Sequence, residues 1–228
     1  MLDSRTIASN AARIRDRLAA ACRRVGRDPN GVRVVAAGKT VPPEGLRAAR
    51  AAGIEEFGEN YVQELRDKRD ALDGVRWHYI GTLQSRTAPR VAEVADVVQT
   101  LAPGRATDRL ARRASKRGAP LDVMIEVDLA GRGSGVEPDR CEGFADDVGA
   151  MDGLHLVGLM TLPPVTPTAE EARPYFSRLR SLRDRVASSH SQAVDLSMGM
   201  SLDYEVAAEE GATIVRIGTA LFGARPPA

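Results

Sequence analysis

Two turns near the end of the chain carry residue types that suit a phosphate group. The first turn, Ser197 to Ser201, follows a short apolar run and is expected to open a helix over Leu202 to Glu210. Backbone N–H groups and the Ser201 hydroxyl would then face an anion at a helix N-terminus. The second turn, Gly218 and Thr219, follows another apolar run, and a glycine there lets a ligand oxygen approach the backbone closely. Two such turns at consecutive strand ends predict a phosphate site.

Lys39 is the residue whose type and place point to covalent chemistry. It follows the first strand-like run, in VRVVAAGKT, and strand alternation puts it on one face with Val35 and Ala37. A lysine amine forms a Schiff base with an aldehyde, and burial near another cation lowers its pKa so that the neutral amine is available. A lysine and a phosphate site together predict a phosphorylated aldehyde as the ligand.

These residues must be positioned by a fold in which strands and helices alternate. Short β-branched runs alternate with amphipathic runs after an N-terminal helix, which is typical of parallel βα units. The expected strands are Val32 to Ala37, Ile54 to Phe57, Trp77 to Ile80, Val94 to Gln99, Leu121 to Val127, Leu154 to Leu159, Ala193 to Leu196 and Thr213 to Ile217. About eight strands close a (β/α)8 TIM barrel of about 250 residues, here with an extra N-terminal helix.

The helical runs lie between those strands. They cover Pro43 to Ala52, Asn60 to Leu72, Arg105 to Arg117, Pro138 to Met151, Ala169 to Ser189 and Leu202 to Glu210. A further helix over Gln84 to Glu93 contains Pro89, which is unfavourable in a helix interior. An open doubly wound sheet is the competing fold, but its usual GxGxxG first turn is replaced here by GKTVPP.

Bulk composition favours a single domain over residues 1–228. With 228 residues and 43% hydrophobic content, the chain can bury one large core. A net charge of +1 and 4% aromatic residues argue against a nucleic-acid partner. The cysteines and histidines lie far apart, so neither a disulfide framework nor a metal site is expected. No targeting segment or membrane-spanning run is visible, and we expect a cytoplasmic protein without a membrane partner.

Barrel closure would bring the candidate groups to one mouth. The first strand pairs with the eighth in a closed barrel, so Lys39 should lie beside Arg216 and one turn from Gly218. Arg216 shares a strand face with Ile214 and should point into the barrel. The loops after strands seven and eight are the habitual phosphate site of this fold. We therefore expect an amine, a phosphate site and a guanidinium group in one place.

Five motifs spread over nearly the whole chain are similar to those of one family. They are GKTVP around Lys39, FGENYVQE from Phe57, WHYIGTLQS from Trp77, GLMTLPP from Gly158, and the final SMGMSLDYEVAAEEGATIVRIGTALFG. On these motifs the chain resembles the pyridoxal 5′-phosphate (PLP) homeostasis protein family. The resemblance implies a monomeric barrel similar to the N-terminal domain of alanine racemase, with PLP as the cofactor.

The resemblance also implies which residues hold the cofactor. They are Lys39, Asn60, Met200, Ser201, Arg216, Gly218 and Thr219. It places the PLP aldimine on Lys39 and Arg216 against the pyridine nitrogen. The phosphate would lie at the two turns described above, with the Met200 backbone nearby.

Two further polar residues in these motifs are Asn60 and His78. Asn60 either forms a capping box with Gln63 at the start of a helix or faces the pocket. His78 shares a strand face with Ile80, and we expect it to be a hydrogen-bonded histidine of the barrel interior.

Three departures from the family pattern concern the mouth. Gly38 stands where serine or threonine is commoner, which is expected to loosen the strand end. Arg86 and Thr87 replace an Asn-Lys pair, and DLAGRGSGV from Asp128 lacks the usual lysine. The last two remove basic residues, which puts an accessory anion or partner contact in doubt but not the PLP site.

The favoured function is a PLP carrier that surrenders the cofactor to apo-enzymes and so affects vitamin B6 and amino-acid balance. No catalytic residue is assigned, because racemisation and transamination need a positioned acid or base on each relevant face. The chain ends at Ala228, soon after its last barrel helix, so we expect no second domain to supply an opposing tyrosine. A PLP-dependent amino-acid racemase and a Schiff-base aldolase are the alternatives, although no strand-end residue clearly offers the acid or base that an aldolase needs.

Overall fold

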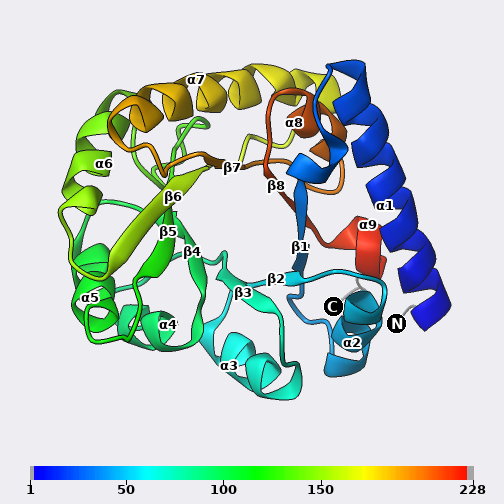
Figure 1. The fold of residues 1–228 in the computed structure, drawn as a ribbon, viewed down its shortest axis with the longest axis horizontal. Coiled ribbons are helices and arrows are strands. Elements are labelled where there is room, and N and C mark those ends of the chain that lie inside the picture. The colour runs from blue at the N-terminus through cyan, green and yellow to red at the C-terminus, as the bar shows by residue number, and fades with distance from the viewer. Residues whose placement is uncertain (1–2, 225–228) are drawn as a thin grey trace.

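A computed structural model describes residues 3–224 and shows a closed, parallel, eight-stranded barrel with helices around it (Figure 1). The strands are β1 (Arg33–Ala37), β2 (Glu56–Glu59), β3 (Arg76–Tyr79), β4 (Val97–Leu101), β5 (Leu121–Glu126), β6 (Leu154–Met160), β7 (Asp195–Ser197) and β8 (Ile214–Ile217). Their order in the barrel is their order in the chain, and β8 pairs with β1 to close it. The predicted (β/α)8 fold is confirmed.

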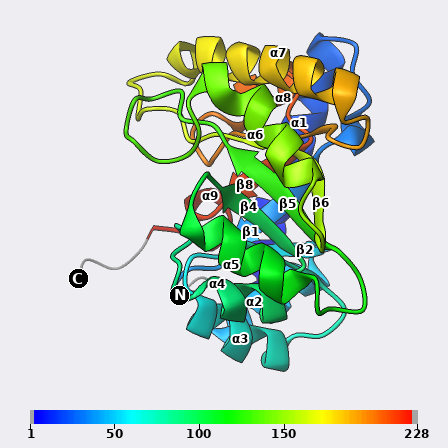
Figure 2. The same cartoon turned by 90° about the vertical axis from the view of Figure 1, so that its left-hand side faces the viewer.

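The helices form a ring outside the strands, which two perpendicular views show (Figures 1 and 2). They are α1 (Ser4–Arg24), α2 (Pro43–Ala51), α3 (Val62–Ala71), α4 (Ala88–Val94), α5 (Arg105–Ala114), α6 (Cys141–Gly149), α7 (Arg173–Ser189), α8 (Tyr204–Glu209) and α9 (Thr219–Phe222), with short 3-10 helices at Pro29–Gly31, Pro138–Arg140 and Ala169–Ala172. No described helix is both long and apolar enough to traverse a bilayer.

The N-terminal helix and the proline-containing helix both follow from their sequences. In α1, Ile7, Ile14 and Leu18 recur at helical spacing and are buried, and the helix packs against α2, α8 and α9. Pro89 lies in the first turn of α4, where the missing N–H would have had no intrahelical partner. The proline therefore starts this helix instead of breaking it.

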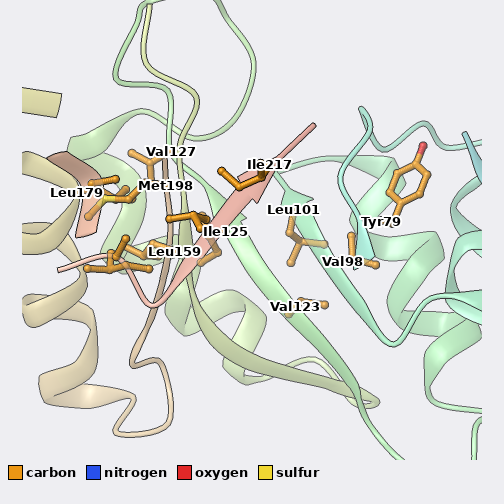
Figure 3. Close-up of a cluster of buried hydrophobic side chains, with 14 of the residues drawn as sticks. Tyr79, Val98, Leu101, Val123, Ile125, Val127, Leu159, Leu179, Met198 and Ile217 are labelled. Carbon is orange, nitrogen blue, oxygen red and sulfur yellow. The ribbon is translucent and has the colours of Figure 1, made fainter. Parts of the chain in front are cut away.

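Alternating residues of each strand divide the core into two layers. Outward-facing side chains such as Val98, Val123 and Leu159 pack under the helices in the cluster that Figure 3 shows. Between them along the strands, other side chains point inward and form a small apolar cluster of Val35, Val97, Met124, Met160 and Ile214. Since strand residues alternate between the two faces, one sequence builds both layers.

Several strands end later than their apolar runs predict. β2 extends to Glu59, β4 to Leu101 and β7 to Ser197, whereas we expected ends at Phe57, Gln99 and Leu196. An apolar run stops where the inward-facing positions become polar, but the backbone ladder continues past that point. The carboxyl ends of β4 and β7 therefore carry Gln99 and Ser197 in the barrel interior, whereas Glu59 of β2 faces Lys68 of α3.

One glycine marks a close approach between neighbouring strands, and its substitution gives a prediction for stability. A Cβ atom on Gly158 of β6 would lie 2.1 Å from the backbone oxygen of Asp195 on β7. We expect Gly158→Ala to lower the free energy of unfolding by roughly 3 kcal/mol, because two paired backbones must separate. The matched control is Gly143→Ala in α6, where a Cβ atom would have open space; it should be neutral or stabilising by up to about 1 kcal/mol. Urea unfolding measures both, and equal effects would contradict this account.

Candidate functional site

Lys39 lies in a tight turn at the carboxyl end of β1. The Val41 N–H donates to the Gly38 carbonyl at 2.8 Å, so Lys39 is the second residue of a four-residue turn. Its amine lies 5.5 Å from the centroid of the ring of Tyr61, which is the residue before α3. Neither residue is buried, and Tyr61 is 54% exposed. The Lys39 amine is thus accessible from the mouth of the barrel.

The turn that carries Lys39 is strained at the next residue. Thr40 has a φ of 64°, and no other described non-glycine residue has a positive φ. A turn of this kind needs positive φ at its third position and favours glycine there, whereas a β-branched residue in that region is a genuine outlier. Such strain costs on the order of 1–3 kcal/mol and persists only where its surroundings enforce it. Backbone strain therefore lies beside the candidate reactive amine.

The two predicted phosphate turns lie against each other. The Ala220 N–H, after β8, donates to the Ser201 hydroxyl, after β7, at 3.1 Å. Gly218 follows β8 directly and is half-buried, whereas Thr219 begins α9 and is exposed. A Cβ atom on Gly218 would find nothing closer than Ala37, at 3.6 Å. Space for a ligand atom thus exists where β8 and β1 end.

The helix after the first turn starts later than we predicted. It begins at Tyr204, not Leu202, so Ser201 is not at a helix N-terminus. The cause is the Asp203 carboxylate, which accepts the Met200 N–H at 2.6 Å and closes a turn ahead of the helix. Burial raises the pKa of Asp203 despite that hydrogen bond. The Met200 N–H is therefore already paired, and the Ser201 hydroxyl is the polar group that this turn presents.

Arg216 points into the barrel, where alternation with Ile214 placed it. It is 5% exposed and donates to the Ser197 hydroxyl at 2.5 Å and to the Thr161 carbonyl at 2.9 Å. Burial lowers the pKa of Arg216 to about 10, although the charges of Asp203 and Glu126 oppose that change, and Arg216 forms no direct ion pair with a carboxylate of residues 3–224. A buried cation without a direct ion pair is costly, so this position suits a ligand atom that accepts a hydrogen bond.

The predicted contact between Arg216 and Lys39 needs correction. β1 and β8 pair as expected, but Arg216 lies opposite Val35, four residues before Lys39. Arg216 therefore lies deeper in the barrel than the turn that carries the lysine. A ligand that touches both must extend from the mouth into the interior.

A chain of hydrogen bonds runs from Arg216 across the barrel interior. Ser197 donates to the Gln99 carbonyl oxygen at 2.7 Å, and the Gln99 amide nitrogen lies 2.8 Å from His78 Nδ1. The other ring nitrogen, Nε2, and Glu56 Oε2 have no other described hydrogen-bond partner and lie 3.0 Å apart. His78 is fully buried, which fits the interior histidine that we expected.

The donors and acceptors along this series of hydrogen bonds determine which atom donates in each one. Arginine can only donate, so the Ser197 proton must go to Gln99, whose amide then donates to His78 Nδ1. The ring proton is therefore on Nε2, facing the Glu56 carboxylate. Burial lowers the pKa of His78 and so favours its neutral form. Burial opposes ionisation of Glu56 as well, but the His78 hydrogen bond and the nearby charges of Arg33 and Arg76 together lower the pKa of Glu56.

Asn60 lies in the loop after β2, but it does not cap the next helix. α3 begins at Val62 without a side-chain cap, and Gln63 donates instead to Asp67 at 2.8 Å, so of the two alternatives the capping box is wrong. Gly81 approaches Asn60 closely, since a Cβ atom on that glycine would lie 2.0 Å from the Asn60 carbonyl oxygen. The half-buried Asn60 is thereby held at the mouth by the neighbouring loop.

Sequence reasoning missed several polar residues around the mouth. They are Glu59, Glu64, Lys68 and Gln99, which join the Lys39 turn or the Arg216 chain, while Ser197 was expected only as the start of a turn. The spacing of Glu64 and Lys68, four residues apart on one helix, is the one signal that could have indicated a pair. Gly38, which we expected to loosen the strand end, is held instead: its N–H donates to Gly58 at 2.9 Å and its carbonyl accepts from Lys68.

Known proteins match this chain over nearly its whole length. A family model described as alanine racemase, N-terminal domain, matches residues 3–226. A pyridoxal phosphate homeostasis protein of Aquifex aeolicus is 41% identical, over 94% of this chain and 96% of that protein. One of Pseudomonas aeruginosa is 40% identical, over 96% of each.

Solved structures give the same picture. PipY of Synechococcus elongatus, solved with PLP bound, has a TM-score of 0.83 and 31% identity, covering 95% of this chain and 100% of that one. An alanine racemase from E. faecalis has a TM-score of 0.72 at 17% identity, covering 99% of this chain and 59% of that one, and shares the fold alone.

The neutral His78 gives a prediction for the pH dependence of stability. Its pKa is lowered in the folded protein, so between about pH 6.5 and the lower folded pKa only the unfolded chain binds this proton. His78 should therefore remove stability as the pH falls below about 6.5, by up to about 1.4 kcal/mol per pH unit. Urea unfolding of His78→Gln from pH 7 to pH 5 should show a flatter curve than the unaltered protein.

The control for that experiment is His155→Gln, which removes an exposed histidine paired with Asp122 and so measures what a surface histidine contributes to the slope. A His78→Gln curve as steep as that of the unaltered protein would show that His78 takes up its proton equally in the folded and unfolded states.

Proposed function

This chain belongs to the pyridoxal phosphate homeostasis protein family, and we propose that it binds PLP through Lys39 at the mouth of its barrel. The observation that carries the assignment is the position of Lys39 between two other features. The phosphate turns lie at the next strand end around the barrel, and the buried Arg216 lies deeper in the interior. These features suit the two ends of a phosphorylated pyridine aldehyde.

The lysines of the chain favour Lys39 as the covalent site. There are three, Lys39, Lys68 and Lys116. Lys68 is buried and donates to three oxygen atoms, and Lys116 lies at the surface beyond α5. When bound, PLP supplies an aldehyde that a neutral lysine amine converts to a Schiff base. Lys39 is the amine that is both accessible and located at the carboxyl end of a barrel strand.

We place the PLP phosphate at the two adjoining turns. The Ser201 hydroxyl and the backbone at Gly218 and Thr219 face the same region, while the Met200 N–H is occupied by Asp203. Hydrogen bonds to a charged group contribute about 1.5 to 3 kcal/mol each. Several of these would give the phosphate a large share of the non-covalent affinity. Asn60 we place beside the bound cofactor, on the opposite side of the Lys39 turn.

Arg216 we place against the pyridine nitrogen. A guanidinium stays protonated and can only donate, so it would keep that nitrogen unprotonated. The ring is then a weaker electron sink than one paired with a carboxylate, and carbanion chemistry is disfavoured. Such a site suits storage of PLP without consumption of amino acids.

We propose that the protein is a carrier of PLP and not a robust catalyst. The homeostasis proteins match this chain over at least 94% of its length, whereas the alanine racemase shares only its fold. The natural recipients of the cofactor are apo-forms of PLP-dependent enzymes. We further propose that the carrier is a single-domain monomer, which analytical ultracentrifugation would test.

Trapping of bound PLP tests the assignment of Lys39. Borohydride reduction of the loaded protein and peptide mass mapping should place the pyridoxyl mass on Lys39, because Lys68 is engaged and Lys116 lacks a phosphate site. Lys39→Met should lose the visible absorbance band of bound PLP, and Lys116→Met should keep it. Pyridoxal, which lacks the phosphate, should bind far more weakly. Label on another lysine, or equal affinity for pyridoxal, would contradict the site.

A chiral assay tests the proposed lack of catalysis. The loaded protein incubated with L-alanine and other amino acids should produce negligible D-isomer, because Arg216 leaves the ring a weak electron sink. An alanine racemase serves as the positive control. Turnover in the usual enzyme range of roughly 1 to 1000 per second would favour the racemase alternative.

A further inference from the structure

Lys68 of α3 is buried under the turn that carries Lys39. Its amine donates to Glu59 at 2.7 Å, to Glu64 at 2.9 Å and to the Gly38 carbonyl at 2.9 Å. A lysine amine has three N–H donors, and all three are used here. The proposed function gives no role to this ammonium group, although it contacts the residue next to Lys39.

The same ion-pair cluster also reaches the other side of Lys39. Glu64 accepts the Thr40 N–H at 3.2 Å with the oxygen that accepts from Lys68. The two peptide groups that flank Lys39 are thus both bound, one by Lys68 directly and one through Glu64. Thr40, whose φ is 64°, is the residue that this contact holds.

We infer that Lys68 and Glu64 are positioning residues that hold the strained turn and thereby aim the Lys39 amine at the cofactor. This inference rests on the proposed role of Lys39. Thr40 cannot favour its backbone conformation by itself, because a β-branched residue is disfavoured at positive φ. An external contact must therefore maintain the turn, and the bonds from α3 to Gly38 and Thr40 supply it.

Glu59 anchors this cluster from the face of β2 that is directed toward α3. It is fully buried on β2, and its Oε1 atom accepts from Lys68. Burial raises the pKa of Glu59 although the Lys68 ammonium opposes that change. A Cβ atom on Gly38 would lie 2.7 Å from Glu59 Oε1. The glycine at position 38 therefore allows the carboxylate to reach the lysine, which accounts for one departure from the family pattern.

The test removes the contact to Thr40 without disturbing the buried pair. Lys68→Met would leave Glu59 buried without a partner and risks unfolding, so the main variant is Glu64→Ala, at a partly exposed position. We expect about tenfold weaker PLP binding, measured from the visible absorbance band, and slower borohydride trapping at Lys39. Urea unfolding separates this effect from a general loss of stability.

A second substitution asks whether the turn itself is the target. Glycine adopts positive φ freely, so Thr40→Gly should restore most of the PLP affinity when added to Glu64→Ala. A merely structural role for Glu64 would not be rescued at a neighbouring loop. The matched control is Asp67→Ala, an exposed carboxylate one turn along α3 that faces Gln63, which should bind PLP like the unaltered protein.

The outcomes separate this inference from the proposed function. If the unaltered protein carries PLP on Lys39 and Glu64→Ala binds it with the same affinity and trapping rate, the positioning role is wrong and the proposed function stands. Failure of Thr40→Gly to rescue a weakened Glu64→Ala would also overturn it. If the unaltered protein takes up no PLP at Lys39, both fall.

Discussion

The interior of this barrel is organised around a guanidinium group that has no carboxylate partner among the described residues. Arg216 is 5% exposed, and two neutral oxygen atoms, from Ser197 and Thr161, accept its hydrogen bonds. A charge in that position requires polar neighbours, so the interior cannot be closed with apolar side chains at this level. The polar residues of β4 and β7 follow from that requirement.

Polar and apolar side chains therefore share the barrel interior. Val35 and Ile214 belong to the inner apolar cluster, yet Val35 lies in register with Arg216 of β8. The ends of β4 and β7 bring Gln99 and Ser197, which continue the chain of hydrogen bonds from Arg216. The same strands thus supply both a packed apolar core and a buried polar chain.

The sequence predicted the large elements, the place of Lys39 after β1 and the burial of Arg216, and it failed where side chains act on the backbone. Strand order, Lys39 after β1 and the inward direction of Arg216 all follow from periodicity, which a chain displays directly. The start of α8 does not, because the Asp203 carboxylate pairs with the Met200 N–H and closes an extra turn. Interior residues such as Gln99 were hidden for a related reason: a polar residue at the end of an apolar run looks like the start of a loop.

The scarcity of lysine described above has a chemical consequence beyond the site. The chain has 32 basic residues, of which three are lysines, so its positive surface consists almost entirely of arginine. Free PLP condenses with unprotonated primary amines, and a guanidinium neither loses its proton at neutral pH nor offers such an amine. For the proposed role in binding PLP, the chain therefore presents few side chains with which the aldehyde could react nonspecifically.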